Sequence, residues 1–157
     1  MKTVKETPTF THKQLAINCF NASWDLLDNT ERSSEEAEEM INLAHTSFWH
    51  WTKVVDHTSQ NLSIGYWQLS RVYAVAELGE RALYYGDRCL EVSLANEIEP
   101  FYIGYAYEAL CRANALLEKN DLAKEQYNFA MEYAQLVKVE KSKESLIKDL
   151  DSIWDNR

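Results

Sequence analysis

The sequence predicts an all-α protein of about seven antiparallel helices in one domain, residues 1–157. Three observations support this class. The chain has only four glycines and two prolines, too few for the many turns of an all-β protein. Apolar residues recur at helical spacing in several segments. A two-helix pattern also occurs twice, at an offset of 41 residues, the distance from Tyr66 to Tyr107.

The repeated pattern occupies residues 64–134 and combines aromatic, aliphatic and small side chains. The matching pairs are Tyr66 and Tyr107, Leu69 and Leu110, Arg71 and Arg112, Ala74 and Ala115, Glu77 and Glu118, Ala82 and Ala123, and Glu91 and Glu132. Small residues stand at positions 70, 82, 89, 111, 123 and 130. We expect them to let paired helix backbones approach closely, because larger side chains there would overpack the interface.

The first copy, Tyr66-x-x-Leu69-Ser70-x-x-Tyr73 followed by Ala82 and Cys89, resembles a tetratricopeptide repeat (TPR). The second copy has Tyr107-x-x-Leu110-Cys111, then Ala123-x-x-x-Tyr127 and Ala130, with Asn114 in place of the tyrosine. The period of 41 exceeds the usual 34 by about two helical turns, so we expect longer helices and short loops. The resemblance implies a TPR-like right-handed superhelix whose first helices line a concave, protein-binding groove.

The N-terminal part is expected to form a degenerate first helix pair at residues 10–57. Residues 1–9 are polar, contain Pro8 and read as a loose lead-in. A helix over 12–28 is predicted by apolar residues at helical spacing, Leu15, Ile17, Phe20, Trp24 and Leu27. Ser33 and Glu36 have capping-box spacing at the start of a second helix that runs to about residue 55.

Two recognisable helix pairs and a terminal helix follow. The first repeat, 62–96, is expected to hold helices over 62–78 and 80–96. The second repeat, 100–138, begins with Pro100 in the first helical turn, reaches about 117, and turns at 119–121 into a helix ending near 137. Residues 140–155 carry an apolar stripe opposite a charged face, typical of a capping helix.

Charge and composition exclude several classes of partner. A net charge of −9 makes nucleic acid or an anionic membrane surface an unfavourable partner. The sequence contains no long apolar run, and residues 1–14 lack the apolar core of a signal peptide. Three cysteines without a disulfide pattern favour a reducing compartment, so we expect a cytoplasmic protein.

The candidate ligand-binding residues lie on the groove-facing side of the first helices. The repeat places Arg71 and Arg112 at equivalent positions on neighbouring helices, where two guanidiniums would suit a carboxylate or phosphate group of a partner. The other residues predicted on this face are Ile64, Trp67, Tyr105 and Glu108. In the alternative interpretation, each arginine only contacts the residue four positions earlier, Trp67 for Arg71 and Glu108 for Arg112.

A second candidate is an aromatic and histidine cluster, for which His45, Trp49 and His50 are possible pocket residues. His45 and His50 are five positions apart, which does not fit the i, i+4 spacing of a helical metal pair. Packing between the first pair and the repeats is the alternative. The sequence shows no phosphate loop, nucleophile elbow or zinc spacing, so we expect no metal, no cofactor and no catalytic residue.

Three functions from different classes therefore remain open. The leading hypothesis is a non-catalytic module that binds a protein or peptide in the concave groove. The first alternative is a small-molecule-binding protein or enzyme with its site between His45–Trp51 and the 62–79 helix. The second alternative is a structural protein that self-associates into a homodimer.

Overall fold

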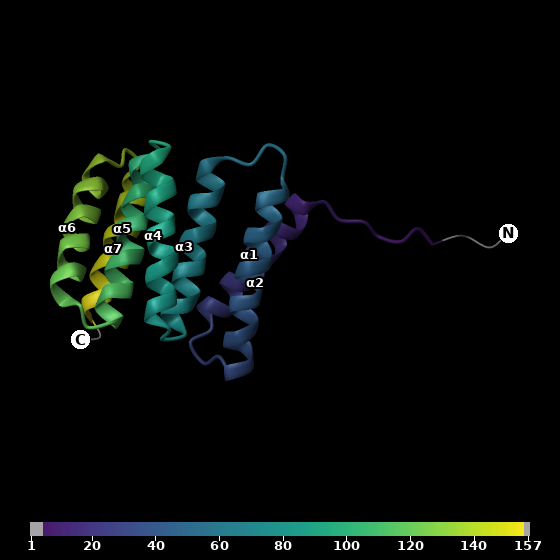
Figure 1. Ribbon diagram of the computed structural model, residues 1–157, viewed down its shortest axis with the longest axis horizontal. Helices are drawn as coiled ribbons and strands as arrows, with labels where there is room; N and C mark the ends of the chain where they lie inside the picture. The colour runs from purple at the N-terminus through teal and green to yellow at the C-terminus, as the bar shows by residue number, and fades with distance from the viewer. Residues whose placement is uncertain (1–4, 156–157) are drawn as a thin grey trace.

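The protein is all-α, as predicted. The computed structural model describes residues 5–155, and within them it contains seven helices and no strand. The helices are α1 (His12–Asp28), α2 (Ser34–Lys53), α3 (Ser59–Val75), α4 (Gly79–Ala95), α5 (Pro100–Leu116), α6 (Asn120–Leu136) and α7 (Glu140–Asp155). The predicted lead-in lies partly outside the described residues, and residues 5–10 are exposed and project from the body (Figure 1).

The helices keep the register of the sequence repeat. The starts of α3 and α5, Ser59 and Pro100, are separated by the predicted offset, and so are the starts of α4 and α6, Gly79 and Asn120. Each of these four helices has 17 residues, and three or four residues connect one to the next. The extra length of the repeat is therefore in the helices, as expected.

Two boundaries of α3 differ from the prediction for local reasons. The helix begins at Ser59, three residues earlier than expected, because Thr58 and Asn61 form a capping box. It ends at Val75 because Glu77 adopts the left-handed conformation, with a φ of 61°. The Leu78 N–H then donates to the Tyr73 carbonyl at 2.9 Å, which completes a Schellman cap.

Small residues bring the paired helices into close contact. The Ser70 hydroxyl of α3 donates to the Ala82 carbonyl of α4 at 2.7 Å, so the predicted approach at these positions is confirmed. Cys111 and Ala123 lie in one buried cluster of α5 and α6. In the first pair, the Ser47 hydroxyl of α2 donates to a carbonyl of α1 at 2.7 Å. In the first pair, too, a serine of one helix therefore bonds to the backbone of the other, although its sequence matches the repeat poorly.

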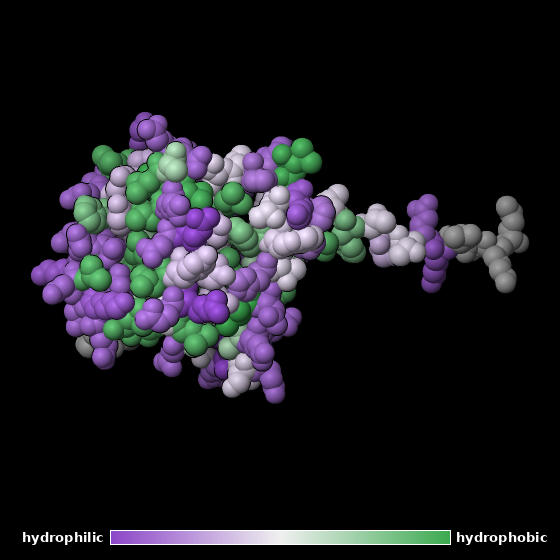
Figure 2. All heavy atoms as spheres, in the orientation of Figure 1, coloured by the Kyte–Doolittle hydropathy of each residue, from purple (hydrophilic) through white to green (hydrophobic). Residues whose placement is uncertain are grey.

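The helices pack as three antiparallel pairs followed by α7. Helix α1 packs on α2, α3 on α4 and α5 on α6, whereas α3, α5 and α7 pack successively against one another. In Figure 1, α2 lies in front of α1 and α6 in front of α7, and the pairs succeed each other along the body. Figure 2 shows apolar side chains interspersed among hydrophilic ones on this face. The right-handed twist stays a prediction.

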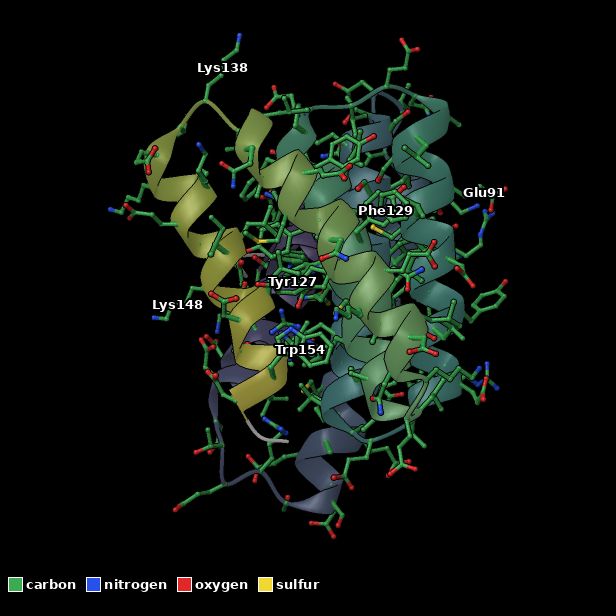
Figure 3. The ribbon with its side chains drawn as sticks, turned by 90° about the vertical axis from the view of Figure 1, so that its left-hand side faces the viewer. Glu91, Tyr127, Phe129, Lys138, Lys148 and Trp154 are labelled. Carbon is green, nitrogen blue, oxygen red and sulfur yellow. The ribbon has the colours of Figure 1, made fainter. Side chains whose placement is uncertain are left out.

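Helix α7 covers the end of the last pair. Its buried residues are Leu146, Leu150 and Ile153, the stripe predicted for a terminal helix. The Tyr127 hydroxyl of α6 donates to Asp151 of α7 at 2.7 Å, and the Tyr127 and Trp154 rings meet at 5.8 Å (Figure 3). No described helix is both long and apolar enough to cross a bilayer.

Candidate functional site

A cavity of about 620 Å³ lies between the odd-numbered helices, and we call it the main cavity. Helices α1, α3, α5 and α7 all contribute to its wall. The lining residues are Trp24, Ser63, Ile64, Trp67, Phe101, Tyr102, Tyr105, Ser145, Lys148 and Asp149. Its volume falls within the range of about 300–1,000 Å³ that is usual for ligand sites.

Aromatic rings form a continuous wall of the main cavity. The Trp24 and Trp67 ring centroids are 5.3 Å apart, so the wall runs from α1 to α3. Trp67 meets Tyr105 edge to face at 5.3 Å, and Tyr105 meets Phe101 in the same way at 5.1 Å. Edge-to-face pairs contribute about 0.5–1.5 kcal/mol each beyond burial, so this wall is mutually supported before any ligand binds.

Glu108 of α5 is the centre of a buried ionic network next to this wall. Its side chain is completely buried. Its Oε1 accepts from Arg71 Nη2 at 3.0 Å and from Arg112 Nη2 at 2.7 Å and Nε at 2.9 Å. Its Oε2 accepts from the Trp67 indole N–H at 3.2 Å. Both carboxylate oxygens are therefore satisfied inside the protein.

The network keeps Glu108 ionised. Burial alone would raise the pKa of this carboxyl group, but Arg71 and Arg112 outweigh burial, and its pKa is lowered from the ordinary value. Hydrogen bonds from Arg112 and Trp67 act in the same direction. The two guanidiniums are thus neutralised in part by a carboxylate of the same chain.

Asp149 connects the network to α7. Its Oδ2 accepts from the Tyr105 hydroxyl at 2.7 Å and lies 3.9 Å from Arg71 Nη2. Arg112 Nη2 also donates to the Asp149 carbonyl at 3.2 Å. Burial, with the hydrogen bond to Asp149, raises the pKa of Tyr105, so this phenol stays protonated and can donate. These bonds hold α7 against α3 and α5.

Lys148 is the one lysine in the lining of the main cavity. Its side chain is exposed and makes no ion pair within residues 5–155. In Figure 3 it extends from α7 away from the body, on the side opposite Glu91 of α4. Lys148 therefore offers a cation that a bound molecule could contact.

The structure divides the predicted groove residues into two groups. Ile64, Trp67 and Tyr105 line the main cavity. Arg71, Arg112 and Glu108 instead bind one another, and Arg71 also stacks over the Trp67 ring at 5.4 Å. The structure therefore contains both contacts of the alternative interpretation, Arg71 with Trp67 and Arg112 with Glu108. The carboxylate on which the two guanidiniums converge is Glu108, from their own chain, because the repeat places it one helical turn before Arg112.

The predicted histidine pocket residues point to different surroundings. His45 Nε2 lies 2.7 Å from the Tyr73 hydroxyl, in a cluster with Tyr85. His50 instead meets His12, with their Nδ1 atoms 2.9 Å apart. Trp49 is 54% exposed. Five helical positions rotate a side chain by about 140°, which explains why the two histidines face different neighbours. No group of three metal-binding side chains occurs within residues 5–155.

Sequence reasoning missed several lining residues, notably Trp24, Phe101, Tyr102, Lys148 and Asp149. Trp24 was assigned to an apolar stripe, and the first pair has no clear repeat register that would align it with Trp67. Lys148 and Asp149 lie on the charged face of α7, which reads as solvent-exposed. The available signal for both was the predicted capping helix over 140–155, because a helix that closes a repeat array packs on the last helix pair.

Comparisons with known proteins identify no relative. No family model matches this chain, no curated protein matches it, and no solved structure matches it. The class that the fold and site define is therefore an all-α helical-pair protein with an aromatic, lysine-bearing cavity between its odd-numbered helices.

Proposed function

We propose that this protein is a non-catalytic interaction module that binds a segment of another protein in the main cavity. The observation that carries the proposal is an aromatic wall built from three helices, beside Lys148, which makes no ion pair with any described residue. Large apolar side chains that enter such pockets supply most of the binding energy in protein interfaces. The TPR-like resemblance, with its concave groove formed by first helices, agrees with this location.

The polar residues beside the cavity support binding more than bond making or breaking. Glu108, Arg71, Arg112, Tyr105 and Asp149 donate to and accept from one another. Each is therefore committed to holding the helices in place. This arrangement presents a shaped receptor to a partner segment, with few adjustments needed on binding.

We also place this activity in the cytoplasm. Cys19, Cys89 and Cys111 form no disulfide with one another. Burial raises the pKa of Cys89 to about 12, so this thiol stays protonated and inert. Cysteines outside disulfides fit a reducing compartment.

The test is selection of displayed random nine-residue peptides on the wild-type protein, followed by binding measurements on Ser145→Trp. Ser145 is exposed and lines the cavity, so an indole there should fill the site and weaken the selected peptides at least tenfold. Asn128→Trp, at an exposed position of α6, is the matched control and should bind normally. Thermal melts would confirm that both variants fold.

Three results would overturn the proposal. The first is a selection that enriches no peptide. The second is a set of enriched peptides that bind Ser145→Trp as tightly as the wild type. The third is peptide loss in Asn128→Trp equal to that in Ser145→Trp, because binding would then not depend on the cavity.

A further inference from the structure

The region around the start of α7 has a charge opposite to that of the whole protein. Residues 138–148 contain four lysines, at 138, 141, 143 and 148, and two glutamates, at 140 and 144, giving a net charge of +2. The whole chain carries −9. None of these four lysines makes an ion pair in the part of the chain that the structure describes. We call them the lysine edge.

Two further cavities adjoin the main cavity through shared walls. Ile64 also lines a smaller cavity of about 190 Å³, with Ile17, Phe20, Trp51 and Asn61. Phe101 and Tyr102 also line a cavity of about 500 Å³, whose other residues include Glu99, Leu136, Val137 and Lys138. The three cavities therefore form one series across α1, α3, α5 and α7, which we call the groove.

The dimensions of the groove indicate an extended ligand. Helices α3, α5 and α7 pack in succession, and α1 lies one further position along the row, where the Gln68 side chain of α3 donates to its Phe20 carbonyl. At about 8–10 Å for each of the three spacings, the row from α1 to α7 covers about 24–30 Å. An extended chain rises about 3.3–3.6 Å per residue, so about eight residues span this distance. Anchoring side chains would enter successive cavities from one such segment.

The charged residues that border the groove indicate the charge of the segment that it binds. Lys148 borders the main cavity and Lys138 borders the cavity next to it. The acidic groups on the same walls are Asp149, which Arg71 and Tyr105 contact, and Glu99. Figure 3 shows Lys138 and Lys148 projecting on the α7 side, away from Glu91. The remainder of an acidic protein repels an acidic segment, which favours docking at this edge alone.

We propose that the groove binds an extended acidic segment of about eight residues from another protein. An aromatic or large aliphatic side chain of the segment enters the main cavity, and its carboxylates pair with Lys148 and Lys138. This inference rests on the proposed function and adds the chemistry of the partner.

The test is whether the peptides that the protein selects from a random nine-residue library are acidic. Wild-type protein should enrich Asp and Glu over Lys and Arg at least threefold relative to the input library. A synthetic peptide from the most enriched group should bind Lys138→Glu/Lys148→Glu at least tenfold more weakly. Its affinity for wild type should also fall between 50 and 300 mM salt, because exposed ion pairs are screened.

Lys119→Glu/Lys124→Glu is the matched control, since both lysines are exposed, belong to the α6 region and carry the same change in net charge. It should alter affinity less than twofold. Enriched peptides that are neutral or basic, or an equal loss in both double variants, would overturn the acidic partner. If such peptides still lost binding in Ser145→Trp, the proposed function would stand. Failure of the proposed function instead appears as no enrichment or no effect of Ser145→Trp.

Discussion

Replacing Glu108 with glutamine should lower the free energy of unfolding by about 3–5 kcal/mol, the cost of breaking a buried ion pair from one side. The substitution keeps the shape of the side chain, so packing changes little. It removes the negative charge that faces Arg71 and Arg112, whose side chains are only 16% and 21% exposed. Two guanidiniums would then stay close together without compensation in a poorly hydrated site.

The hydrogen bonds show why glutamine cannot replace the carboxylate. If the amide oxygen accepts from the guanidiniums, its NH₂ group faces the Trp67 indole N–H, now 3.2 Å from Oε2. If the amide is reversed, its NH₂ group faces three guanidinium N–H contacts. Either orientation sets donor against donor. Urea denaturation should show the loss as a midpoint shift of about 1.5 M or more, at a slope near 2 kcal/mol/M. A loss below about 1 kcal/mol would refute the reasoning.

Two further variants distinguish the effect of leaving buried charges unpaired from the effect of losing an ion pair as such. Glu91→Gln breaks the exposed Arg88–Glu91 pair, in which the side chains are 37% and 67% exposed, and should cost less than about 1 kcal/mol. The triple variant Arg71→Met/Glu108→Leu/Arg112→Met removes the buried carboxylate and both half-buried guanidiniums together. It should be as stable as the wild type, or more stable. Packing of apolar side chains of similar size offsets the lost ion pairs, and three charges no longer have to be taken out of water.

The acid response should follow Glu108 as well. Its pKa is lowered in the folded protein, whereas the unfolded chain takes up the proton near the ordinary value of 4.5. The stability contributed by the carboxylate is therefore complete above that pH and is lost as pH falls through the folded pKa. Between pH 5 and 3, Glu108→Gln should lose less stability than the wild type. A steeper decline in the variant would contradict this assignment.

Four other substitutions test the helix ends, the close contacts and a half-buried histidine, each by urea denaturation. Glu77→Gly and Glu118→Gly should each raise stability by about 0.5–1 kcal/mol, because the left-handed conformation at φ 61° and 60° strains a side chain more than glycine costs in entropy. Gly104→Ala should lower it by about 1–3 kcal/mol, because the new Cβ would lie 2.6 Å from Leu146 Cδ2. Burial lowers the pKa of His45, so stability should fall as pH drops below the ordinary 6.5, and His45→Gln should flatten this decline between pH 7 and 5.

The left-handed positions and Gly104 have matched control variants, and the histidine has an outcome that would contradict its prediction. Glu125→Gly, at an exposed position inside α6, should lower stability by about 1 kcal/mol, and a gain there would remove the case for the left-handed positions. Gly86→Ala should cost less than Gly104→Ala, since its Cβ would lie 3.1 Å from Leu110 Cδ2. Identical pH dependence in wild type and His45→Gln would show that His45 contributes nothing to it.

The repeat predicted most of the fold because it records backbone contacts directly. Ser70 and Ala82 must be small where α3 meets α4, so the offset in the sequence reappears as the offset between helix starts. Helix ends were predicted less well because they depend on single side chains. The Thr58–Asn61 capping box moved the start of α3, and Glu77 ended it in a conformation that usually selects glycine.

The site was predicted in part for a different reason. Periodicity placed Trp67, Arg71, Glu108 and Arg112 on one side of the first helices, and the structure brings their side chains together. Periodicity within one helix cannot say which charges on two helices will pair. The sequence therefore predicted Glu108 as one more groove residue beside the arginines. In the structure, its carboxylate is the group that both arginines bind.

The ionic network has a consequence for the proposed binding site that exceeds its effect on stability. Asp149 receives bonds from Tyr105 and Arg112 and lies near Arg71, and the next residue toward the N-terminus is Lys148. The network therefore fixes where α7 presents Lys148 relative to the aromatic wall. The triple apolar variant would remove the Arg112 hydrogen bond and the Arg71 contact to Asp149 and keep the Tyr105 hydrogen bond, while the core stays filled. If the network sets the geometry of the site, that variant should stay folded yet discriminate less between acidic and basic peptides. Unchanged discrimination would show that apolar packing of Leu146, Leu150 and Ile153 positions α7 without help from the charges.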